Sequence, residues 1–384
     1  MRHGIAIVGI LALLASGCQG ELDAQAEASE GLDDVSLGAE FADHFLIGNA
    51  LNVDQIMSGD DAFEAFLLQH FNALTAENAM KWERIHPAED EWNWAPADQL
   101  VEFANRHGIH LTGHTLVWHQ QTPDWVFEDA NGNPASRELL LERMKAHIEA
   151  VVGRYQGRVP SWDVVNEGIE EDGSMRDTVW RQIIGDDYIE KAFEYAHAAD
   201  PDAILFYNDY NMFAPGRRDG VIALVQRLRA KGIPIHGIGL QGHMRVDYPE
   251  TLDGFEEAIE AYGELGVDVA ITELDVSVLP WPGEKAGGAD IMDRHEFDAM
   301  MNPFVDGLTP EAQAAFDRRY LDLFRILLDH SDVVTRVTFW GINDGVSWRN
   351  DWPMEGRTDY PLLIDRDNRL KPVWRDIIAL KNAR

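Results

Sequence analysis

Short apolar runs alternate with longer amphipathic stretches along most of the chain. In several stretches apolar residues recur at helical spacing, which predicts helices that pack on one face. The two clearest apolar faces are Val221, Leu224, Val225 and Leu228, and Leu140, Met144, Ile148, Val151, Val152 and Tyr155. A third helix is expected to begin at Pro310 with Thr309 as its N-cap, because proline fits the first helical position.

Glycine separates helical stretches from the apolar runs that follow. It does so at Gly108, Gly157, Gly232 and Gly266, where a left-handed backbone can end a helix without steric cost. Eight short apolar runs are predicted as strands: residues 45–50, 73–75, 111–115, 161–165, 204–207, 237–241, 269–272 and 337–341. This alternation predicts a closed (β/α)8 barrel. An open doubly wound sheet is the alternative, but no GxGxxG or Walker motif follows a strand.

Polar side chains follow most of the predicted strands. They are Glu77, Asn78, His114, Asn166, Glu167, Asn208, Asp209, Gln241, His243, Glu273, Asp275, Asn343 and Asp344. A barrel gathers the C-terminal ends of its strands at one mouth, where active sites lie. We therefore expect a ring of carboxylates, imidazoles and amides. Asn208 and Asp209 are expected to brace neighbouring side chains, with direct substrate contact as the alternative.

Two glutamates end the fourth and seventh predicted strands. Glu167 and Glu273 would face each other across the mouth, and such a pair suits glycoside hydrolysis. One carboxyl group would protonate the leaving oxygen while the other attacks carbon or activates water. For either residue alone a solvated surface carboxylate is the alternative, since the chain has 67 acidic residues.

Several motifs resemble those of glycoside hydrolase family 10, the (β/α)8 endo-β-1,4-xylanases. The matching stretches are TAENAMKW at 75–82, GHTLVWH at 113–119, WDVVNE at 162–167, GLQGH at 239–243, ITELDV at 271–276, FWGIND at 339–344, Ser347-Trp348, PLL at 361–363 and Lys371-Pro372. They occur in order and span about residues 43–384. The resemblance implies cleavage of xylan and xylo-oligosaccharides without a cofactor or a metal.

The resemblance also implies a retaining, double-displacement mechanism. Glu167 would be the general acid/base and Glu273 the nucleophile. Retention requires carboxyl groups about 5–5.5 Å apart. We expect the charge of Glu273 to raise the pKa of Glu167, because two close carboxylates resist joint ionisation.

Supporting residues follow from the same resemblance. Asn166 would hydrogen-bond the sugar 2-hydroxyl, and His243, held by Asp275, would orient the nucleophile. The other substrate contacts would be Glu77, Asn78, Lys81, His114 and Gln241, with Trp118, Trp340 and Trp348 as aromatic walls. Trp82, Trp180 and Trp374 are expected to be structural.

Three competing functions would each require different residues. A metal-dependent hydrolase could use His114, His119 and His243, but the chain has no His-Glu-x-x-His motif and no His-x-His at a strand end. A non-catalytic glycan-binding lipoprotein would not need both glutamates. A β-1,4-glucanase or cellobiohydrolase-type enzyme shares the chemistry. Since xylose lacks the hydroxymethyl group of glucose, Lys81 and Trp348 would exclude glucosides sterically.

The N-terminus predicts export. Arg2 precedes an apolar run at 5–15, which is shorter than the roughly 20 residues that span a bilayer and fits a signal peptide. Ala15-Ser16-Gly17-Cys18 resembles a bacterial lipobox, so we expect a lipidated Cys18, with an ordinary secretory signal as the alternative. The expected organisation is a signal peptide at 1–17, a lipidated, acidic, flexible tether at 18–42 and one catalytic barrel at 43–384. The protein would be anchored at the outer membrane or cell surface, or else secreted.

Charge narrows the possible partners. The chain has 32 Lys and Arg against 67 Asp and Glu, which gives a net charge of −35. Such a charge repels nucleic acid and anionic lipid headgroups, so we expect no nucleic-acid partner and no membrane contact other than the lipid anchor. Cys18 is the only cysteine, so neither an intramolecular disulfide nor a cysteine zinc site is possible. Only 7 of the basic residues are Lys, and such an acidic surface resembles those adapted to salty water. We expect a monomer.

Overall fold

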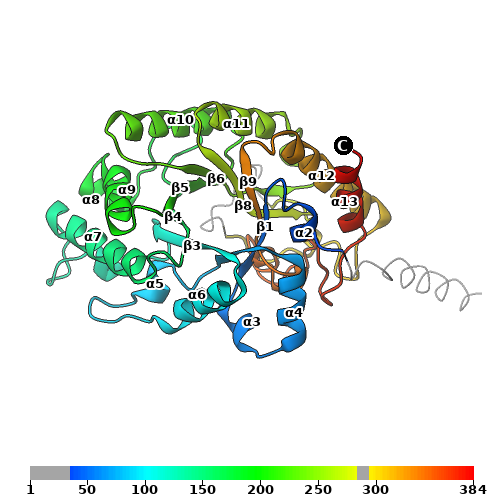
Figure 1. Ribbon diagram of the computed structural model, residues 1–384, viewed down its shortest axis with the longest axis horizontal. Helices are drawn as coiled ribbons and strands as arrows, with labels where there is room; N and C mark the ends of the chain where they lie inside the picture. The colour runs from blue at the N-terminus through cyan, green and yellow to red at the C-terminus, as the bar shows by residue number, and fades with distance from the viewer. Residues whose placement is uncertain (1–34, 283–293) are drawn as a thin grey trace, which may run out of the picture.

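A parallel β-barrel lies at the centre of the computed structural model, which describes residues 35–282 and 294–384 (Figure 1). Strands pair in the order β6-β5-β4-β3-β2-β1-β9-β8, and β6 also pairs with β8, which closes the barrel. Its eight strands are β1 (Leu46–Leu51), β2 (Ala73–Ala76), β3 (His110–Val117), β4 (Ser161–Asn166), β5 (Ile204–Asp209), β6 (Gly237–Leu240), β8 (Asp268–Ser277) and β9 (Val334–Phe339). The predicted (β/α)8 barrel is confirmed.

Helices surround the barrel in Figure 1. They are α2 (Leu37–Glu40), α3 (Val53–Met57), α4 (Asp61–His70), α5 (Trp82–Ile85), α6 (Ala95–His107), α7 (Arg137–Arg154), α8 (Val179–Ile184), α9 (Tyr188–Ala199), α10 (Pro215–Ala230), α11 (Asp253–Glu264), α12 (Pro310–Asp329) and α13 (Val373–Asn382). The predicted apolar faces of α7 and α10 are buried. Thr309 caps α12 by accepting a hydrogen bond from the Ala312 amide, and Gly108 ends α6 with a φ of 66°.

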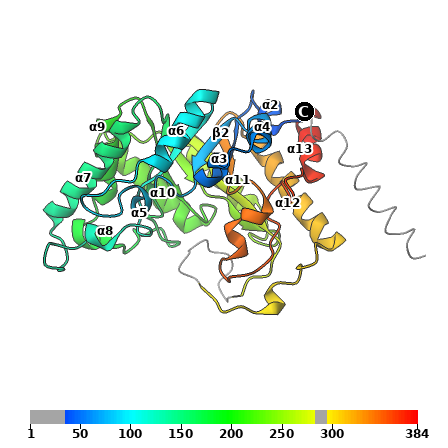
Figure 2. The same cartoon turned by 90° about the horizontal axis from the view of Figure 1, so that it is seen from below.

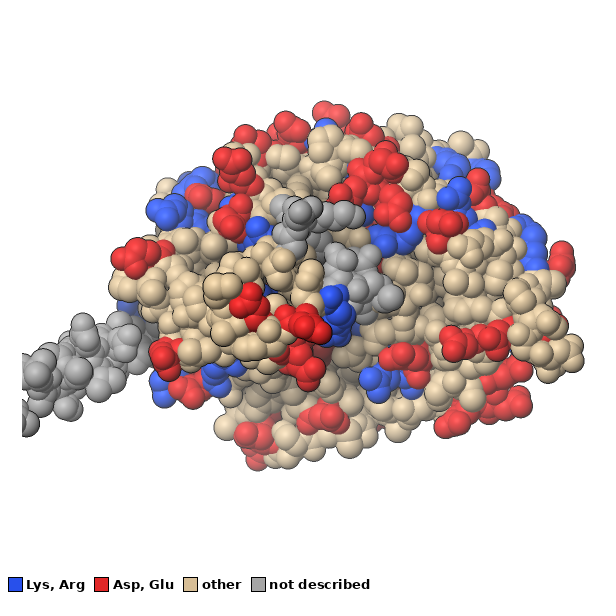
Figure 3. Space-filling view, turned by 180° about the vertical axis from the view of Figure 1, so that it is seen from behind, with Lys and Arg blue, Asp and Glu red and all other residues tan. Residues whose placement is uncertain are grey.

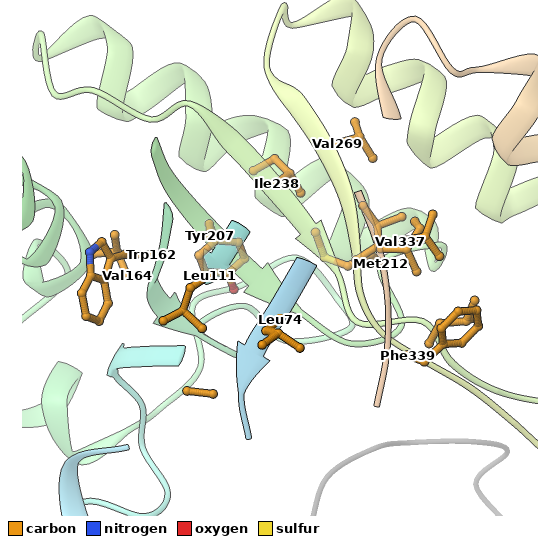
Figure 4. Close-up of a cluster of buried hydrophobic side chains, with 14 of the residues drawn as sticks. Leu74, Leu111, Trp162, Val164, Tyr207, Met212, Ile238, Val269, Val337 and Phe339 are labelled. Atoms are coloured by element: carbon orange, nitrogen blue, oxygen red, sulfur yellow. The ribbon is translucent and has the colours of Figure 1, made fainter. Parts of the chain in front are cut away.

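The apolar core packs around the strands, as Figure 4 shows for side chains such as Leu74, Leu111 and Val337. The barrel interior, in contrast, holds polar groups. Nη1 of Arg336 on β9 lies 3.3 Å from Nε2 of His110 and 3.4 Å from Oγ of Ser161. Since β9 does not pair with β3 or β4, these contacts cross the barrel.

Three strand predictions differ from the structure. Strand β8 spans Asp268–Ser277, whereas the sequence predicted 269–272, so Glu273 and Asp275 lie inside the strand. The last barrel strand spans Val334–Phe339, whereas the sequence predicted 337–341. The buried Arg336 explains the shift, because a charged residue inside a strand interrupts the apolar pattern that marks it. A ninth strand, β7 (His243–Arg245), was not predicted and pairs with β8.

The predicted tether is wrong in its last eight residues, because residues 35–42 belong to the folded body. Leu37 and Phe41 are fully buried. The Trp374 indole donates a hydrogen bond to the Val35 carbonyl at 2.9 Å, and Lys381 pairs with Glu40 at 3.1 Å. Sequence reasoning missed this segment because only a few apolar residues stand among small and acidic ones. The predictions for 1–17 and for 18–34, including Cys18, lie outside the described residues.

This first segment enters the barrel at the end opposite the strand C-termini. Helix α2 precedes β1 in the chain, and Asn72, just before β2, donates a hydrogen bond to the Gly38 carbonyl at 2.9 Å. In Figure 2, α2 lies at the upper edge, while the yellow segment that precedes α12 and the orange segment that follows β9 lie toward the lower edge.

Acidic side chains are scattered over the surface. Figure 3 shows red Asp and Glu side chains across the visible face, with blue Lys and Arg side chains between them. The charge of −35 therefore does not form one docking patch on that face. Within residues 35–282 and 294–384, no helix has both the length and the apolar composition needed to cross a membrane.

Candidate active site

A cavity of about 190 Å³ opens at the C-terminal ends of the barrel strands. Its walls comprise Glu77, Asn78, Lys81, His114, Trp118, Gln121, Asn166, Glu167, Gln241, His243, Glu273, Trp340 and Trp348. All of these residues except Gln121 were predicted from the sequence. Asp275, the remaining predicted member, lies directly behind His243 and is fully buried.

Glu273 is surrounded by hydrogen-bond donors. Its Oε1 accepts a hydrogen bond from the Asn208 amide at 2.8 Å, and its Oε2 lies 3.1 Å from Nε2 of His243. Burial alone would raise the pKa of Glu273, but the His243 hydrogen bond, electrostatic interactions with His114 and His243, and the Asn208 hydrogen bond together lower it. Glu273 is therefore held as a carboxylate.

His243 links two carboxylates. Its Nδ1 lies 2.9 Å from Oδ2 of Asp275, while its Nε2 faces Glu273. Burial would lower the pKa of His243, but the charge of Asp275 and the hydrogen bonds to Asp275 and Glu273 raise it. A doubly protonated ring donates to both carboxylates, so the imidazolium form fits this geometry.

Glu167 has a different environment. Its Oε2 accepts a hydrogen bond from the Trp118 indole at 3.0 Å, and its Oε1 accepts hydrogen bonds from Gln241 at 3.0 Å and Asn166 at 3.2 Å. Burial and, second, the negative charge of Asp209 raise the pKa of Glu167 to about 7. The acid/base candidate is thus half protonated near neutral pH.

The cause of this pKa corrects one sequence expectation. The sequence predicts that the charge of Glu273 raises the pKa of Glu167, whereas burial and Asp209 are the leading causes in the structure. Asp209 is fully buried on β5, where it accepts a hydrogen bond from the Tyr207 hydroxyl at 2.5 Å and lies 3.5 Å from Nη1 of Arg217. The sequence could not show that this carboxylate points toward Glu167.

A chain of amides connects the two glutamates. Gln241 donates to Glu167 and to the side-chain Oδ1 of Asn166. Asn208 donates to that same Oδ1 at 2.9 Å and to Glu273. Thr272 orients Asn208 by donating to its Oδ1 at 2.6 Å. Asn208 is buried outside the cavity wall, so it braces its neighbours as the sequence suggested.

Lys81 supplies a cation to the cavity wall. Its Nζ donates to Oδ1 of Asn78 at 3.0 Å and to Oε1 of Gln121 at 2.8 Å, and it lies 5.1 Å from the Trp118 ring and 5.9 Å from the Trp340 ring. Burial lowers the pKa of Lys81, although nearby glutamates, Glu273 foremost, oppose this. Polar groups hydrogen-bond sugar hydroxyls, and indole faces pack against the C–H faces of a sugar ring. The cavity wall offers both kinds of surface side by side.

Sequence reasoning missed four residues that hold this site together. Three of them form hydrogen bonds with predicted residues: Gln121 with Lys81, Asp163 with His114 at 2.9 Å, and Arg349 with Asp275 at 3.0 Å. The fourth is Arg176, whose positive charge lowers the pKa of Glu167 and so opposes the effect of burial. Asp163 and Arg349 stand inside or beside the recognised motifs, and that adjacency was the available signal. Within the described residues, no group of three or more His, Cys, Asp or Glu side chains is placed to hold a metal.

The fold and the site define a class of protein. A (β/α)8 barrel whose mouth holds one ionised and one partly protonated glutamate among amides and indoles is a glycoside hydrolase. The chain belongs to glycosyl hydrolase family 10, whose family model matches residues 36–380.

Similar proteins carry the names of xylanases. Endo-1,4-beta-xylanase A of Xylanibacter ruminicola is 48% identical over 88% of this chain and 91% of its own. Endo-1,4-beta-xylanase of Geobacillus stearothermophilus is 45% identical over 88% of this chain and 97% of its own. A solved GH10 endoxylanase from a sugarcane soil metagenome superposes with a TM-score of 0.87, at 40% identity, over 90% of this chain and all of the other.

Proposed function

We propose that this protein is an endo-β-1,4-xylanase that hydrolyses internal xylosidic bonds with retention of configuration. One observation carries the proposal: Glu167 and Glu273 line one cavity and differ in ionisation, Glu273 being held as a carboxylate while Glu167 has a pKa of about 7. The family membership and the xylanases at 45–48% identity support xylan as the substrate.

The first step transfers the glycosyl group to the enzyme. A Glu273 oxygen forms a bond to the anomeric carbon while the glycosidic bond breaks, and Glu167 gives its proton to the leaving oxygen. Asn166 is placed to hydrogen-bond the sugar 2-hydroxyl. His243 and Asn208 hold Glu273 in place through their contacts at 3.1 and 2.8 Å.

The second step releases the sugar. Glu167, now ionised, takes a proton from water, whose oxygen bonds to the anomeric carbon as the bond to Glu273 breaks. The charges of the two steps balance because Glu167 first loses and then regains one proton. The retained configuration is measured by ¹H NMR of the initial products, and an inverted anomer would refute this mechanism.

The Glu273→Ala variant distinguishes an enzyme from a protein that only binds glycans. We expect this variant to lose hydrolysis while still binding xylo-oligosaccharides in calorimetry. The matched control is Glu264→Ala, which removes an exposed carboxylate at the end of α11 and should leave activity unchanged. A wild-type protein that binds xylo-oligosaccharides but never cleaves them would favour a glycan-binding protein instead.

Preference for xylan over β-1,4-glucan rests on the walls near Lys81 and Trp348. The test compares turnover on xylan, carboxymethylcellulose and an aryl xylobioside. Faster turnover on the cellulosic substrate than on xylan would refute the xylanase assignment and favour a glucanase. Full activity after chelator treatment is expected, since the proposed steps use only carboxyl groups.

We further propose that Cys18 is lipidated and anchors a monomeric enzyme to a membrane. The segment Ala15-Ser16-Gly17-Cys18 supports this, as does the entry of the chain at Val35, on the barrel end opposite the cavity. An anchor there would leave the cavity open to polymer. Mass spectrometry of the mature N-terminus, with Cys18→Ser as control, tests lipidation, and light scattering of the body tests the monomer.

A further inference from the structure

Asp275 receives more hydrogen bonds than are needed to hold His243. Its Oδ2 accepts from His243 at 2.9 Å and from the Trp348 indole at 2.7 Å. Its Oδ1 accepts from Nε and Nη2 of Arg349, at 3.2 and 3.0 Å. Because Asp275 is fully buried, these side chains replace its water and Arg349 supplies a full positive charge.

Arg349 is fixed by aromatic rings. Its guanidinium lies 4.8 Å from the Trp348 ring and 5.4 Å from the Trp352 ring, and the two indoles stack at 4.6 Å. The side chain is 3% exposed and lies outside the cavity wall. It therefore touches a cavity wall, Trp348, on one side and the support of the nucleophile, Asp275, on the other.

We propose that Arg349 is a positioning residue for the nucleophile, the far end of a chain of alternating charge that runs Arg349, Asp275, His243, Glu273. This rests on the proposed function and deepens it. The guanidinium keeps Asp275 ionised, Asp275 keeps the His243 ring doubly protonated, and the ring keeps Glu273 ionised. Arg349 also packs on Trp348, so it fixes the position of this sugar-binding wall relative to Glu273.

Burial explains why the far cation is needed. A fully buried carboxylate takes up a proton readily, and the charges of Arg349 and then His243 oppose this, so the pKa of Asp275 stays lowered. Without Arg349, Asp275 becomes easier to protonate. A neutral His243 carries a single N–H and cannot donate to both carboxylates, so the pKa of Glu273 rises.

Other charged and titratable groups also face this chain, and they stay in place when Arg349 is replaced. They are His114 from β3, Lys81 before α5, Glu167 after β4, Tyr320 from α12, and Arg357 and Asp359 from the segment after β9. Of these, Arg357 offers a matched control. It is 5% exposed, yet it donates to the carbonyls of Pro280 and Trp352 rather than to Asp275.

The test compares Arg349→Met with Arg357→Met in the pH profile of kcat/KM on an aryl xylobioside. We expect the acid limb of Arg349→Met to move up by about one pH unit, a roughly tenfold loss at low pH, with the basic limb unchanged. Arg349→Lys should restore much of the acid limb, because it keeps the charge. Arg357→Met should lower thermal stability without moving the limb.

Failure would be clear in either of two measurements. An unmoved acid limb in folded Arg349→Met, or equal movement in Arg357→Met, overturns the proposal. If Arg349→Met does not fold, ¹⁵N NMR of wild-type His243 still tests the proposal, because a singly protonated ring at pH 7 would overturn it. That spectrum needs no turnover, so an inactive wild type would refute the xylanase proposal and leave this one separately testable.

Discussion

Replacing the buried pair Asp209 and Arg217 tests what sets the protonation of Glu167. In Asp209→Asn/Arg217→Met both charges disappear together, so no unpaired buried charge remains. The asparagine can still accept the hydrogen bond that the Tyr207 hydroxyl now gives to Asp209. Methionine can keep an apolar contact on the Tyr210 ring, which the Arg217 guanidinium covers at 4.1 Å.

The expected magnitude follows from the pKa of Glu167. Its rise from 4.5 to about 7 corresponds to about 3 kcal/mol. Burial is the largest cause and Asp209 the second, so we expect the double variant to lower the pKa of Glu167 by roughly 0.7. At pH 8 the protonated fraction of Glu167 then falls from about 9% to about 2%, a roughly fivefold loss of acid catalysis.

The assay is the pH profile of kcat/KM on two aryl xylobiosides. With a poor leaving group the basic limb should move down, while at pH 5 the rate should change little. With a dinitrophenyl leaving group, which needs no proton from Glu167, the double variant should match the wild type at pH 8. An unmoved basic limb in a folded double variant refutes the role of Asp209.

A second measurement separates Asp209 from Glu273 as the cause. The pKa of Glu167 can be followed by ¹³C NMR in the inactive Glu273→Gln variant and in the double variant. We expect the larger fall in the double variant. A larger fall in Glu273→Gln would restore the explanation based on paired carboxylates.

Three further predictions address other parts of the molecule. Asn208→Ala removes a hydrogen bond from Glu273 and should lower kcat by about tenfold to a hundredfold with a smaller change in KM, measured by steady-state kinetics on xylo-oligosaccharides. Deletion of residues 1–34 should leave the melting temperature unchanged, whereas deletion of 1–42 should lower it, because the second deletion removes buried apolar side chains. Activity should persist at molar salt, and a sharp loss near 1 M sodium chloride would contradict salt adaptation.

The barrel could be predicted because its strands obey a simple pattern. Gly108 and Thr309 mark helix ends, and apolar runs mark strands, so local sequence contained the elements and their order. The pattern failed at Arg336, a charged residue inside the barrel, and at residues 35–42, where Leu37 and Phe41 are buried against distant parts of the chain. Both failures depend on contacts between segments far apart in sequence.

The site could be predicted as a set of residues more fully than as a network. The motifs named the residues of the cavity wall, with Gln121 as the exception. They did not indicate what keeps Glu273 charged and raises the pKa of Glu167. This depends on Asp209, which acts on Glu167 through its charge, and on Arg349, which acts on Glu273 through Asp275 and His243. The sequence indicates that Glu167 and Glu273 lie at two barrel strands, whereas their protonation depends on the groups that surround them.

The opposite protonation of the two glutamates follows from two separate sets of neighbours. Burial raises the pKa of both, so burial alone would make two acids. At Glu273 the contacts from His243, His114 and Asn208 together outweigh burial, whereas at Glu167 the charge of Asp209 adds to the effect of burial. Because Arg349 and Asp209 act from different segments, their variants should move opposite limbs of the pH profile independently. In a variant that combines Arg349→Met with Asp209→Asn/Arg217→Met, the acid limb should therefore move up and the basic limb down, each by as much as in the separate variants. The pH range of activity should narrow by the sum of the two shifts.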